Sequence, residues 1–521
     1  MDPMSWKKEV DAIAERRALA QKMGGDEAVA AHHERGRFTV RERIERLIDP
    51  GSFSEQGPLA GHSEYDDEGR LVAFTPGNYV LGLARIDGRP CAIGGEDFTQ
   101  RGGSPTPAGL RKSVYAEELA CHYRIPLVRF LEGGGGSVRG AGKGSGGARP
   151  TGDPVFTRPR FESIARIMAT APVVSAAVGA VAGFPAARLA ASHFSIMTRT
   201  TSQVLVAGPA VVERALGSPI TKEELGGAQV HGKSGVVDNV AEDEDEVFDL
   251  VKRFLSYLPG NIWELPPRLE GSAHEVDPRE RCEEMLLEII PRERKKVYKM
   301  RRLLEAVLDA GSFFEMTPGY GRSQITGLGR IEGRSVGVIA NDPYVYGGSM
   351  GAEGAQKVER FITLCETFHL PILSFVDEPG FMIGPDAEKA ATIRYGVDAI
   401  VAAMRSTVPW ASVIVRKMYG VAAAAHFGPD ATVFSWPSAE AGALPVEGGV
   451  AVAFRREIAA APDPEARRAE LEEAMSKGRS AFPRAEAFGV HDLIDPRRTR
   501  PVLCEWLDWV EPLLAARVAT R

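Results

Sequence analysis

The stretch Gly82-Leu83-Ala84-Arg85-Ile86-Asp87-Gly88-Arg89 returns 245 residues later as Gly327-Leu328-Gly329-Arg330-Ile331-Glu332-Gly333-Arg334. Three further pairs keep the same order along the chain: residues 49–55 with 309–315, residues 125–128 with 370–373, and residues 170–172 with 407–409. Offsets of 237 to 260 residues are far too long for a solenoid repeat. The echoes predict two related domains joined head to tail, and a site between them is the natural place for a ligand.

The composition fits a globular protein of two or more domains. The 521 residues exceed what one hydrophobic core usually serves, and 44% hydrophobic with 26% charged residues is ordinary for such a chain. The formal net charge of -7 argues against nucleic acid as the main partner. The five cysteines are scattered and form no Cys-x-x-Cys pair, which argues against a disulfide framework or a metal site and makes a reducing cytoplasm the simplest location.

The order of the predicted elements indicates an α/β fold with much parallel pairing. Residues 6–48 carry spaced apolar residues in an Ala-, Glu-, Arg- and Lys-rich background, which predicts a helical arm on the surface. Runs such as 79–86 predict strands, and helices are expected between the apolar runs at 127–131 and 173–178. Residues 259–278 have the composition of a linker. We therefore divide the chain into residues 1–265 and 266–521.

The apolar run at 171–191 is the one stretch that resembles a membrane span. Ser175, Pro185 and Arg188 interrupt it, and its Val-then-Ala/Gly texture predicts a buried strand, a turn and a helix instead. The first eight residues lack the apolar core of a signal peptide.

The densest glycine tract, residues 133–147, directly follows a predicted strand. Bare backbone N–H groups in such a tract can approach an anion closely, so a phosphate of a nucleotide is the obvious candidate ligand. The residues that we expect to bind it are Gly134, Gly135, Gly136, Arg139 and Lys143. The tract is not a P-loop, because Gly144 follows Lys143 where that motif has Ser or Thr. From composition alone, a flexible loop is an equally good interpretation.

Residues 178–187 and their counterpart 415–426 predict a strand that breaks at glycine and restarts as an Ala-rich helix. Such a turn presents unpaired N–H donors, which is how a preorganised oxyanion hole is built. The duplication predicts two such holes. Tight packing between strand and helix is the alternative explanation of the small residues.

Several common catalytic motifs are absent from the sequence. There is no His-Glu-x-x-His, no Gly-x-Ser-x-Gly elbow, no Rossmann fingerprint and no ligand-spaced histidine cluster. His426 and His231 are possible acid–base groups, although a lone histidine is more often structural. Asp377 and Glu378 form a possible carboxylate pair at a strand end, but adjacent residues of an extended chain point to opposite faces, which favours a turn cap.

Taken together, these residues resemble one known family, the carboxyltransferase (β) subunits of biotin-dependent acyl-CoA carboxylases, such as propionyl-CoA and methylcrotonyl-CoA carboxylases. The matching stretches are residues 35–44, 47–53, 100–104, 223–228 with His231, 234–236, 375–381, 416–420 and 494–500. The block from Glu223 to Val236 is highly specific, and the matches span nearly the whole chain.

The resemblance implies tandem duplicated crotonase-like domains with an N-terminal helical arm, the first on the acyl-CoA side and the second on the biotin side. It also implies a homohexamer, a dimer of trimers, with each site between one chain's first half and another chain's second half. In such enzymes CO2 is released from carboxybiotin, the α-proton of the acyl-CoA passes to a biotin nitrogen, and the enolate attacks CO2 through its α carbon or, in vinylogous substrates, its γ carbon.

Two oxyanion holes follow from this mechanism, one for the thioester and one for the biotin carbonyl. By position they fall at Gly183 with Phe184, and at Gly420 with Val421 and Ala422. The sequence contains no Met-Lys-Met biotin attachment motif. The implied partner is therefore a separate biotin carboxylase and biotin carboxyl carrier (α) subunit, and acyl-CoA is the implied substrate.

The sequence departs from the family at the expected site. The family usually has Gly-Gly where this chain has Gly183-Phe184, and an aromatic residue followed by a polar one where this chain has Ala423 and Ala424. A backbone N–H survives any substitution except proline, so the holes can persist while the pocket changes shape. The small residues predict an acyl group bulkier than acetyl or propionyl.

Three alternatives stay open. The first is the carboxyltransferase of a biotin-dependent acyl-CoA decarboxylase, which uses the same site in the opposite direction. The second is a biotin-independent crotonase-like enzyme, which needs side-chain carboxylates near the glycine turns. The third is a non-catalytic partner subunit of a mixed hexamer.

Overall fold

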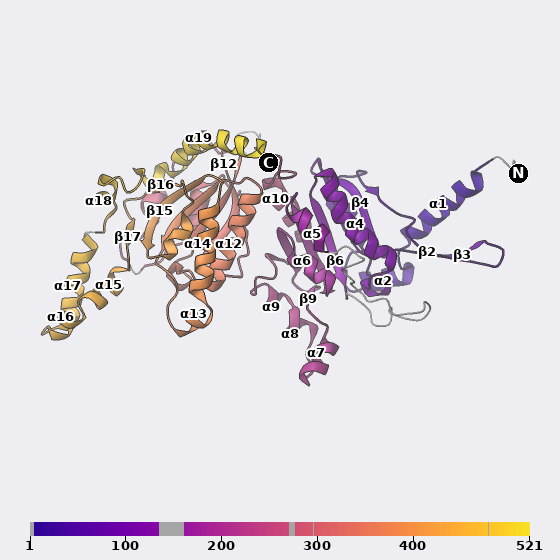
Figure 1. Cartoon of the computed structure of the whole chain (residues 1–521), viewed down its shortest axis with the longest axis horizontal. Coiled ribbons are helices and arrows are strands. Elements are labelled where there is room, and N and C mark those ends of the chain that lie inside the picture. Colours follow the sequence, from indigo (N-terminus) through magenta and orange to yellow (C-terminus); the bar gives the residue numbers. More distant parts are fainter. Residues whose placement is uncertain (1–4, 135–160, 270–276, 295, 478, 521) are drawn as a thin grey trace. The chain divides into compact units, whose positions relative to one another are not determined.

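The computed structural model describes residues 5–134, 161–269, 277–294, 296–477 and 479–520. The chain forms two compact units, Met1–Asn261 and Ile262–Arg521, each with its own sheet (Figure 1). The predicted α/β class, with parallel strands in both halves, is confirmed.

The first unit is built on a sheet with strand order β1-β4-β5-β6-β7-β8-β10, and β9 pairs with β7 at its side. Pairing is antiparallel from β1 to β5 and parallel from β5 to β10. The strands of this unit are β1 (Ser54–Glu55), β2 (Gly61–Tyr65), β3 (Leu71–Pro76), β4 (Tyr79–Ile86), β5 (Arg89–Glu96), β6 (Leu127–Gly133), β7 (Val173–Ala182), β8 (Phe194–Thr198), β9 (Gln203–Leu205) and β10 (Asn239–Ala241).

Helices cover both faces of the first sheet. The described helices are α1 (Lys7–Gln21), α2 (Asp26–His33), α3 (Val40–Leu47), η1 (Arg101–Gly103), α4 (Pro107–Tyr123), α5 (Phe161–Met168), α6 (Phe184–Ala190), α7 (Pro209–Leu216), α8 (Lys222–Gly226), α9 (Ala228–His231) and α10 (Glu244–Tyr257). Leu119 of α4 and Ile167 of α5 join one buried cluster with Leu127 of β6. On the opposite face, the ring of Phe248 in α10 packs edge-on against Phe130 of β6 at 5.9 Å. Successive residues of β6 thus bury opposite faces, as in a parallel sheet covered on both sides.

The second unit repeats this plan strand for strand, in the order β11-β12-β13-β14-β15-β16-β18, with β17 paired beside β15. Its strands are β11 (Phe314–Met316), β12 (Gln324–Ile331), β13 (Arg334–Asn341), β14 (Ile372–Glu378), β15 (Trp410–Tyr419), β16 (Thr432–Ser435), β17 (Glu440–Gly442) and β18 (Asp492–Leu493). Its described helices are η3 (Glu284–Leu287), α11 (Met300–Val307), η4 (Tyr346–Gly348), α12 (Ala352–Thr367), α13 (Pro385–Lys389), α14 (Thr392–Arg405), η5 (Ala422–His426), α15 (Val446–Ala453), α16 (Arg455–Ala460), α17 (Pro464–Lys477), α18 (Ala481–Glu486), η6 (Pro496–Arg498) and α19 (Thr499–Ala519).

The sequence echoes are hairpin turns with a shared anchor. Asp49 accepts the N–H groups of Asp87 and Gly88 at 3.0 and 2.8 Å, and these two residues have positive φ in the turn between β4 and β5. In the second unit, Asp309 accepts the N–H groups of residues 332 and 333 at 3.1 and 2.8 Å in the same way. The repeated Asp and Gly are therefore explained by a turn that requires positive φ and a carboxylate to hold it.

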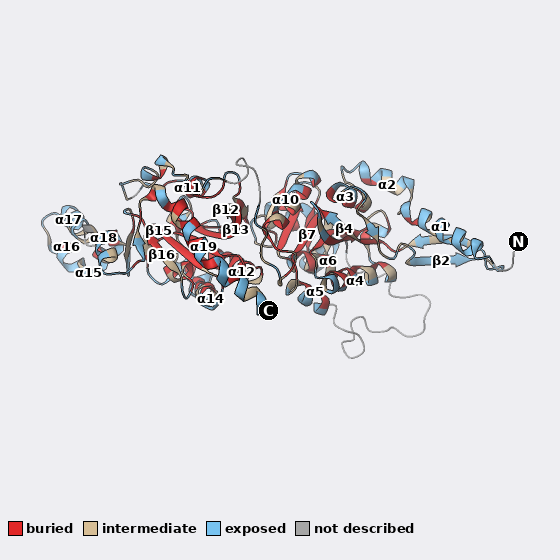
Figure 2. Cartoon of the chain, turned by 90° about the horizontal axis from the view of Figure 1, so that it is seen from above, coloured by how far each residue is buried: buried red, intermediate tan, exposed pale blue. Residues whose placement is uncertain are grey.

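The N-terminal arm differs in part from the expectation. It is helical as predicted, and α1 is largely exposed (Figure 2). Helix α3, however, buries Val40, Ile44 and Leu47 and belongs to the core of the first unit, with Thr39 and Glu42 forming a capping box at its start. The apolar side chains of α3 face the sheet, whereas α1 and α2, which bury one residue each, lie on the surface as predicted.

The apolar run at 171–191 forms strand β7, a turn at Gly183 and helix α6, as predicted. Among the described residues, no helix is long and apolar enough to cross a membrane.

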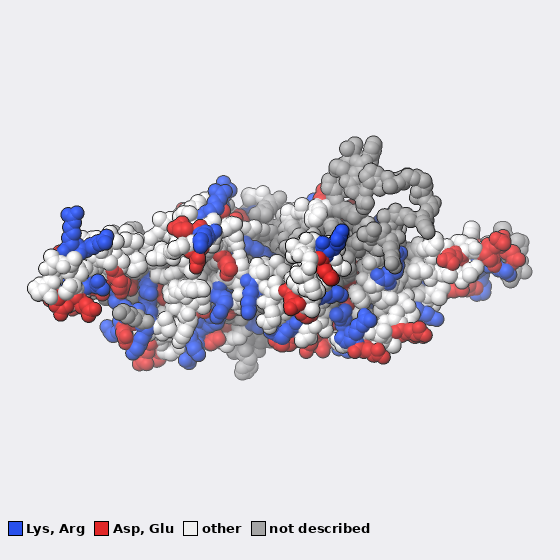
Figure 3. Space-filling model, turned by 90° about the horizontal axis from the view of Figure 1, so that it is seen from below, with Lys and Arg blue, Asp and Glu red and all other residues white. Residues whose placement is uncertain are grey.

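On the face that Figure 3 shows, basic and acidic side chains are interspersed over both units. The charge of each cavity is therefore set by the residues that line it.

Candidate functional site

In the first unit, strand β7 ends in a conformation that favours glycine. Gly183 has φ +65° and ψ -127°, which is costly for any residue with a β-carbon. Helix α6 begins at Phe184, and the Ala187 N–H donates to the Gly183 carbonyl oxygen over 3.0 Å. Because Pro185 has no N–H, the first-turn donors are those of Phe184 and Ala186. The strand, glycine and helix predicted here are present.

The side chain of Phe184 is held on two sides. Its ring meets the Phe161 ring edge-on at 5.5 Å, and the Arg188 guanidinium carbon lies 4.3 Å from its centroid. Arg188 is buried and donates to Glu117 Oε1 over 2.8 Å and to Ser113 Oγ over 2.9 Å. The Phe184 ring is thus held between Phe161 and Arg188.

A cavity of about 90 Å³ lies beside this turn, between Phe184, Pro185, Arg188 and Glu96. Glu96 ends strand β5, and its Oε2 accepts the Glu132 N–H over 3.2 Å. Burial raises the pKa of this carboxyl. Glu96 was not predicted as a site residue, although the internal repeat contained a signal. The equivalent strand of the second unit, β13, ends with Asn341, so the carboxyl at this position is present in the first unit alone.

A larger cavity of about 770 Å³ opens along helix α4 of the same unit. Its lining includes the basic side chains of Arg111, Lys112 and Arg166 and the acidic side chains of Glu118 and Glu162. Burial lowers the pKa of Lys112 to about 8. A volume of this order can hold the body of a cofactor-sized ligand. These residues could not be identified from the sequence, because they are separated along the chain and match no motif.

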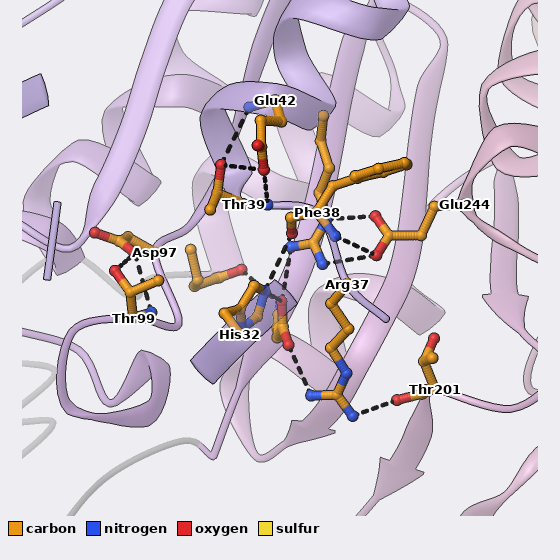
Figure 4. Close-up of polar contacts among 12 residues, drawn as sticks. His32, Arg37, Phe38, Thr39, Glu42, Asp97, Thr99, Thr201 and Glu244 are labelled. Atoms are coloured by element: carbon orange, nitrogen blue, oxygen red, sulfur yellow. Dashed lines mark hydrogen bonds and ion pairs between the residues drawn. The ribbon is translucent and has the colours of Figure 1, made fainter. Parts of the chain in front are cut away.

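The start of the glycine tract is anchored by a buried ion cluster (Figure 4). Glu132, two residues before Gly134, accepts from Arg43 at 2.7 Å and from Arg37 at 3.0 Å. Arg43 also pairs with Glu244 at 2.5 Å, and Arg37 donates to the Thr201 carbonyl oxygen at 2.8 Å. Three segments of the unit therefore meet at the carboxyl end of β6. Gly134 is exposed there, whereas Gly135, Gly136, Arg139 and Lys143 lie outside the described residues.

In the second unit, Gly420 directly follows β15 and has φ +65°, as Gly183 directly follows β7 in the first unit. The Gly420 N–H donates to the Gly442 carbonyl oxygen over 3.1 Å, so it is already used. Among the described residues, neither the Val421 N–H nor the Ala422 N–H donates to an acceptor. The free donors of this turn are therefore those of Val421 and Ala422.

The chain after Gly420 continues as the short 3₁₀ helix η5, in contrast to the α-helix α6 of the first unit. The Ala424 N–H donates to the Val421 carbonyl oxygen over 3.0 Å, which closes this tighter turn. Ala422 and Ala423 are buried, Ala424 is half-buried and Val421 is exposed. Of the two predicted substrate-binding alanines, Ala424 is the more accessible.

Asp377 and Glu378 are both fully buried at the end of β14. Asp377 accepts from the Tyr298 hydroxyl at 2.9 Å and from the Lys417 N–H at 3.1 Å. Glu378 accepts the Gly380 N–H at 3.0 Å, as a turn cap does, and also the Asn341 side-chain amide at 3.0 Å. Burial raises the pKa of both carboxyls.

His426 and His231, the two possible acid–base groups, both form hydrogen bonds within the protein. His426 is fully buried, with Nδ1 2.9 Å from Ser374 Oγ and Nε2 3.5 Å from Glu378 Oε2. His231 contacts Ser234 Oγ at 3.0 Å and the Val204 carbonyl oxygen at 2.8 Å. Both ring nitrogens of each histidine thus have partners within the protein.

Each unit therefore offers N–H donors beside a glycine at the carboxyl ends of parallel strands, which is where ligands bind in open α/β sheets. Such donors can stabilise a developing oxyanion. Among the described residues, no group of three or more side chains is arranged to hold a metal ion.

The carboxyl transferase domain model matches residues 31–511. The carboxyltransferase subunit of propionyl-CoA carboxylase from Haloferax mediterranei is 35% identical over 504 residues, covering 95% of each chain. The 12S subunit of methylmalonyl-CoA carboxyltransferase from Propionibacterium freudenreichii is 33% identical over 506 residues, covering 96% of this chain and 93% of that one. A solved structure of transcarboxylase 12S, a hexamer with methylmalonyl-coenzyme A and methylmalonic acid bound, superposes with a TM-score of 0.85 at 31% identity, over 97% of this chain and 95% of that one.

Proposed function

Because this chain belongs to the carboxyl transferase family, as a biotin-dependent acyl-CoA carboxyltransferase with tandem crotonase-like units, we propose that it moves a carboxyl group from carboxybiotin to an acyl-CoA through a thioester enolate. The observation that carries this proposal is the repeated turn: β7 and β15 are each directly followed by a glycine of positive φ and then by N–H donors. An enolate and a urea carbonyl each place charge on an oxygen, and each needs such donors.

In this proposal Gly183 and Phe184 hold the thioester oxygen, and Val421 and Ala422, next to Gly420, hold the carbonyl oxygen of the biotin ring. The two donors of the second turn suit a urea carbonyl, since they are adjacent and unused among the described residues. Carboxybiotin, when bound, supplies CO2 and the ring nitrogen that takes the α-proton. The protein's own part is to orient both oxygens and to exclude water.

The coenzyme A moiety has two candidate supports in the first unit. The cavity along α4 carries Arg111, Lys112 and Arg166, whose charges complement phosphates. The glycine tract with Gly134, Gly135, Gly136, Arg139 and Lys143 follows the anchored end of β6. We assign the phosphates to these basic groups.

The acyl group is proposed to be bulkier than acetyl or propionyl. Ala423 and Ala424 are small where the family carries an aromatic and a polar residue, and Ala424 is partly accessible. An aromatic side chain at this position would bury about 150 Å² or more of surface, and the alanines leave that space to the ligand. Comparing kcat/KM for short and bulky acyl-CoAs tests the assignment, and a clear preference for acetyl-CoA would contradict it.

The partner in this proposal is a separate biotin carboxylase and biotin carboxyl carrier subunit, and the assembly is a cytoplasmic homohexamer. The test is transfer of ¹⁴C from a carboxylated biotin carrier to a panel of acyl-CoAs by the purified full-length chain. Label in one acyl-CoA supports the proposal and names the substrate. Label in none, with the chain folded and the carrier carboxylated, contradicts it. The reverse assay, from carboxylated acyl-CoA to carrier, measures whether decarboxylation is the favoured direction.

Glu96 favours one alternative, a biotin-independent crotonase-like enzyme. It is the kind of buried carboxyl that such an enzyme needs, in a cavity beside the Gly183 turn. Exchange of the acyl-CoA α-proton with deuterated water in the absence of any biotin compound would identify it, and loss of that exchange in Glu96→Gln would assign the residue.

A further inference from the structure

The second unit contains a cavity of about 350 Å³ at the carboxyl ends of its parallel strands. Gly347 follows β13, Pro379 follows β14, and Arg416, Lys417 and Tyr419 belong to the end of β15. The cavity reaches the Gly420 turn through Tyr419. This is the edge of an α/β sheet at which ligands are bound, but the roles assigned above do not use these side chains.

The cavity has an excess of positive charge. Arg294, Lys296, Arg416 and Lys417 line it, against the single acid Glu447. Arg294 is paired with Glu440 at 2.8 Å and Lys296 with Glu293 at 3.0 Å. Arg416, in contrast, donates to neutral oxygens alone within the described part of the chain, the carbonyls of residues 293, 294 and 296 at 2.6 to 3.2 Å. Among the described residues, the Lys417 ammonium has no ion-pair partner, although its charge acts on the buried Asp377, whose pKa is raised by burial.

The cavity also holds an unsatisfied donor. The Tyr419 side chain is 1% exposed, and its hydroxyl has no hydrogen bond of good geometry among the described residues, although Arg479 and Glu440 lie nearby. Burial raises the pKa of this phenol to about 12, so it keeps its proton at neutral pH. A buried hydroxyl without an acceptor costs stability, and structures retain such groups where a ligand satisfies them.

The internal repeat shows that the fold does not require these side chains. With the offset of 237 residues that aligns Gly183 with Gly420, the counterparts of Arg416, Lys417 and Tyr419 are Gly179, Ala180 and Ala182. The strand pairings agree, since Ala180 pairs with β9 where Lys417 pairs with β17. The same backbone is therefore built in the first unit from residues that carry no charge and no side-chain donor. Arg416 has a structural role, since it holds three carbonyl oxygens, but among the described residues no such contact explains the Lys417 ammonium or the Tyr419 hydroxyl, which points to a ligand for these two.

We propose that this cavity of the second unit binds a carboxylate, with the Lys417 ammonium and the Tyr419 hydroxyl as donors and Arg416 as a fixed positive charge. A carboxylate accepts two such hydrogen bonds, and its negative charge is attracted to the Lys417 ammonium, which has no ion-pair partner among the described residues. The inference rests on the proposed function for the identity of the natural ligand, the carboxyl group in transfer. The binding chemistry itself depends only on the residues of the cavity.

The experiment measures anion binding by the full-length protein directly. Thermal unfolding is recorded in sodium acetate and in sodium phosphate, against sodium chloride at equal ionic strength, for the wild type, Lys417→Gln and Tyr419→Phe. Lys389→Gln, an exposed lysine on α13 that is 79% accessible, is the matched control. Crystals grown without carboxylates and soaked in acetate locate the bound anion.

We expect acetate to raise the Tm of the wild type and of Lys389→Gln above the value in chloride, and Lys417→Gln to bind acetate about tenfold or more weakly. Difference density within hydrogen-bond distance of Tyr419 Oη and Lys417 Nζ would support the site. The proposal would be overturned if acetate raised the Tm of Lys417→Gln and of Tyr419→Phe as much as it raises the Tm of the wild type. An empty cavity after soaking would also overturn it. A larger effect of phosphate than of acetate would overturn the carboxylate assignment.

The same protein preparation is used for ¹⁴C transfer, so that the two proposals fail separately. Carboxyl transfer without acetate binding overturns the cavity and leaves the proposed function intact. Acetate binding without transfer supports the cavity and contradicts the proposed function. Should Lys417→Gln unfold, Tyr419→Phe removes a single oxygen from the same cavity and gives the same comparison.

Discussion

The replacement Val421→Pro tests the second oxyanion turn with little disturbance of the fold. Proline removes the Val421 N–H, which donates to no acceptor among the described residues, so no intramolecular hydrogen bond is lost there. Val421 has φ -71°, within the range of the proline ring, and it is 63% exposed. The preceding residue is Gly420, which has no β-carbon to clash with the ring.

What remains is the loss of one donor to the reacting oxygen. Removal of one donor from an oxyanion hole costs about 2.7–4 kcal/mol, so we expect kcat to fall by about 10²–10³. The fall should appear in kcat more than in KM, because the donor matters most where charge develops. The assay is transfer of ¹⁴C from the carboxylated carrier to the preferred acyl-CoA.

Val421→Ala is the control, since it shortens the side chain and keeps the N–H. We expect it to retain kcat within a few-fold. If Val421→Pro unfolds at the wild-type Tm and still turns over at nearly the wild-type rate, the Val421 N–H is not a donor in the reaction and the assignment of the second turn is wrong.

Three other changes probe the first unit. Arg43→Met leaves the buried carboxylates of Glu132 and Glu244 without their common partner, so urea denaturation should show that the free energy of unfolding falls by about 3–5 kcal/mol. The control is Arg46→Met at the exposed pair with Asp245, which should lower it by about 0–1 kcal/mol. Equal losses in the two variants would contradict the role of burial. Burial lowers the pKa of His32 below its ordinary 6.5, so the unfolded chain binds the proton more readily than the folded one, and the free energy of unfolding should be at its full value above about pH 6.5 and fall below it. His32→Gln should flatten that fall in urea titrations from pH 8 to 5, whereas His62→Gln at an exposed position should not. Phe184→Ala removes the contacts with Phe161 and Arg188 and should cost about 1–3 kcal/mol while raising kcat/KM for bulky acyl-CoAs relative to propionyl-CoA; an unchanged preference would mean that the ring does not border the acyl group.

Local sequence patterns predicted more of the fold than of the candidate site. The duplication, the run of strands and helices, and the glycine turns at Gly183 and Gly420 could all be predicted, because each depends on neighbouring residues or on a closely repeated stretch of sequence. Glu96 was missed because its importance comes from the cavity beside Phe184, which is formed by residues far apart in the chain.

Contacts over long sequence separations were equally beyond reach. Nothing around Arg43 indicates that its partners are Glu132, 89 residues on, and Glu244, 201 residues on. The use of the Gly420 N–H by Gly442 likewise depends on the pairing of β17 beside β15, which composition does not reveal. The prediction that α3 lies on the surface was wrong for the same reason. Its apolar side could be assigned to the core only when the position of the sheet was known.

The ion cluster around Glu132 also sets an order of events during synthesis of the chain. Arg43 leaves the ribosome early, whereas Glu244, its second carboxylate partner, follows 201 residues later, so the ion cluster cannot be completed until nearly the whole first unit has emerged. At about 5–20 residues per second, that delay is on the order of 10 to 40 s. The second unit contains a buried ion pair of similar separation, in which Arg500 donates to Asp309 across 191 residues. Each half of the nascent chain should therefore expose unpaired charges until it is almost completely synthesised.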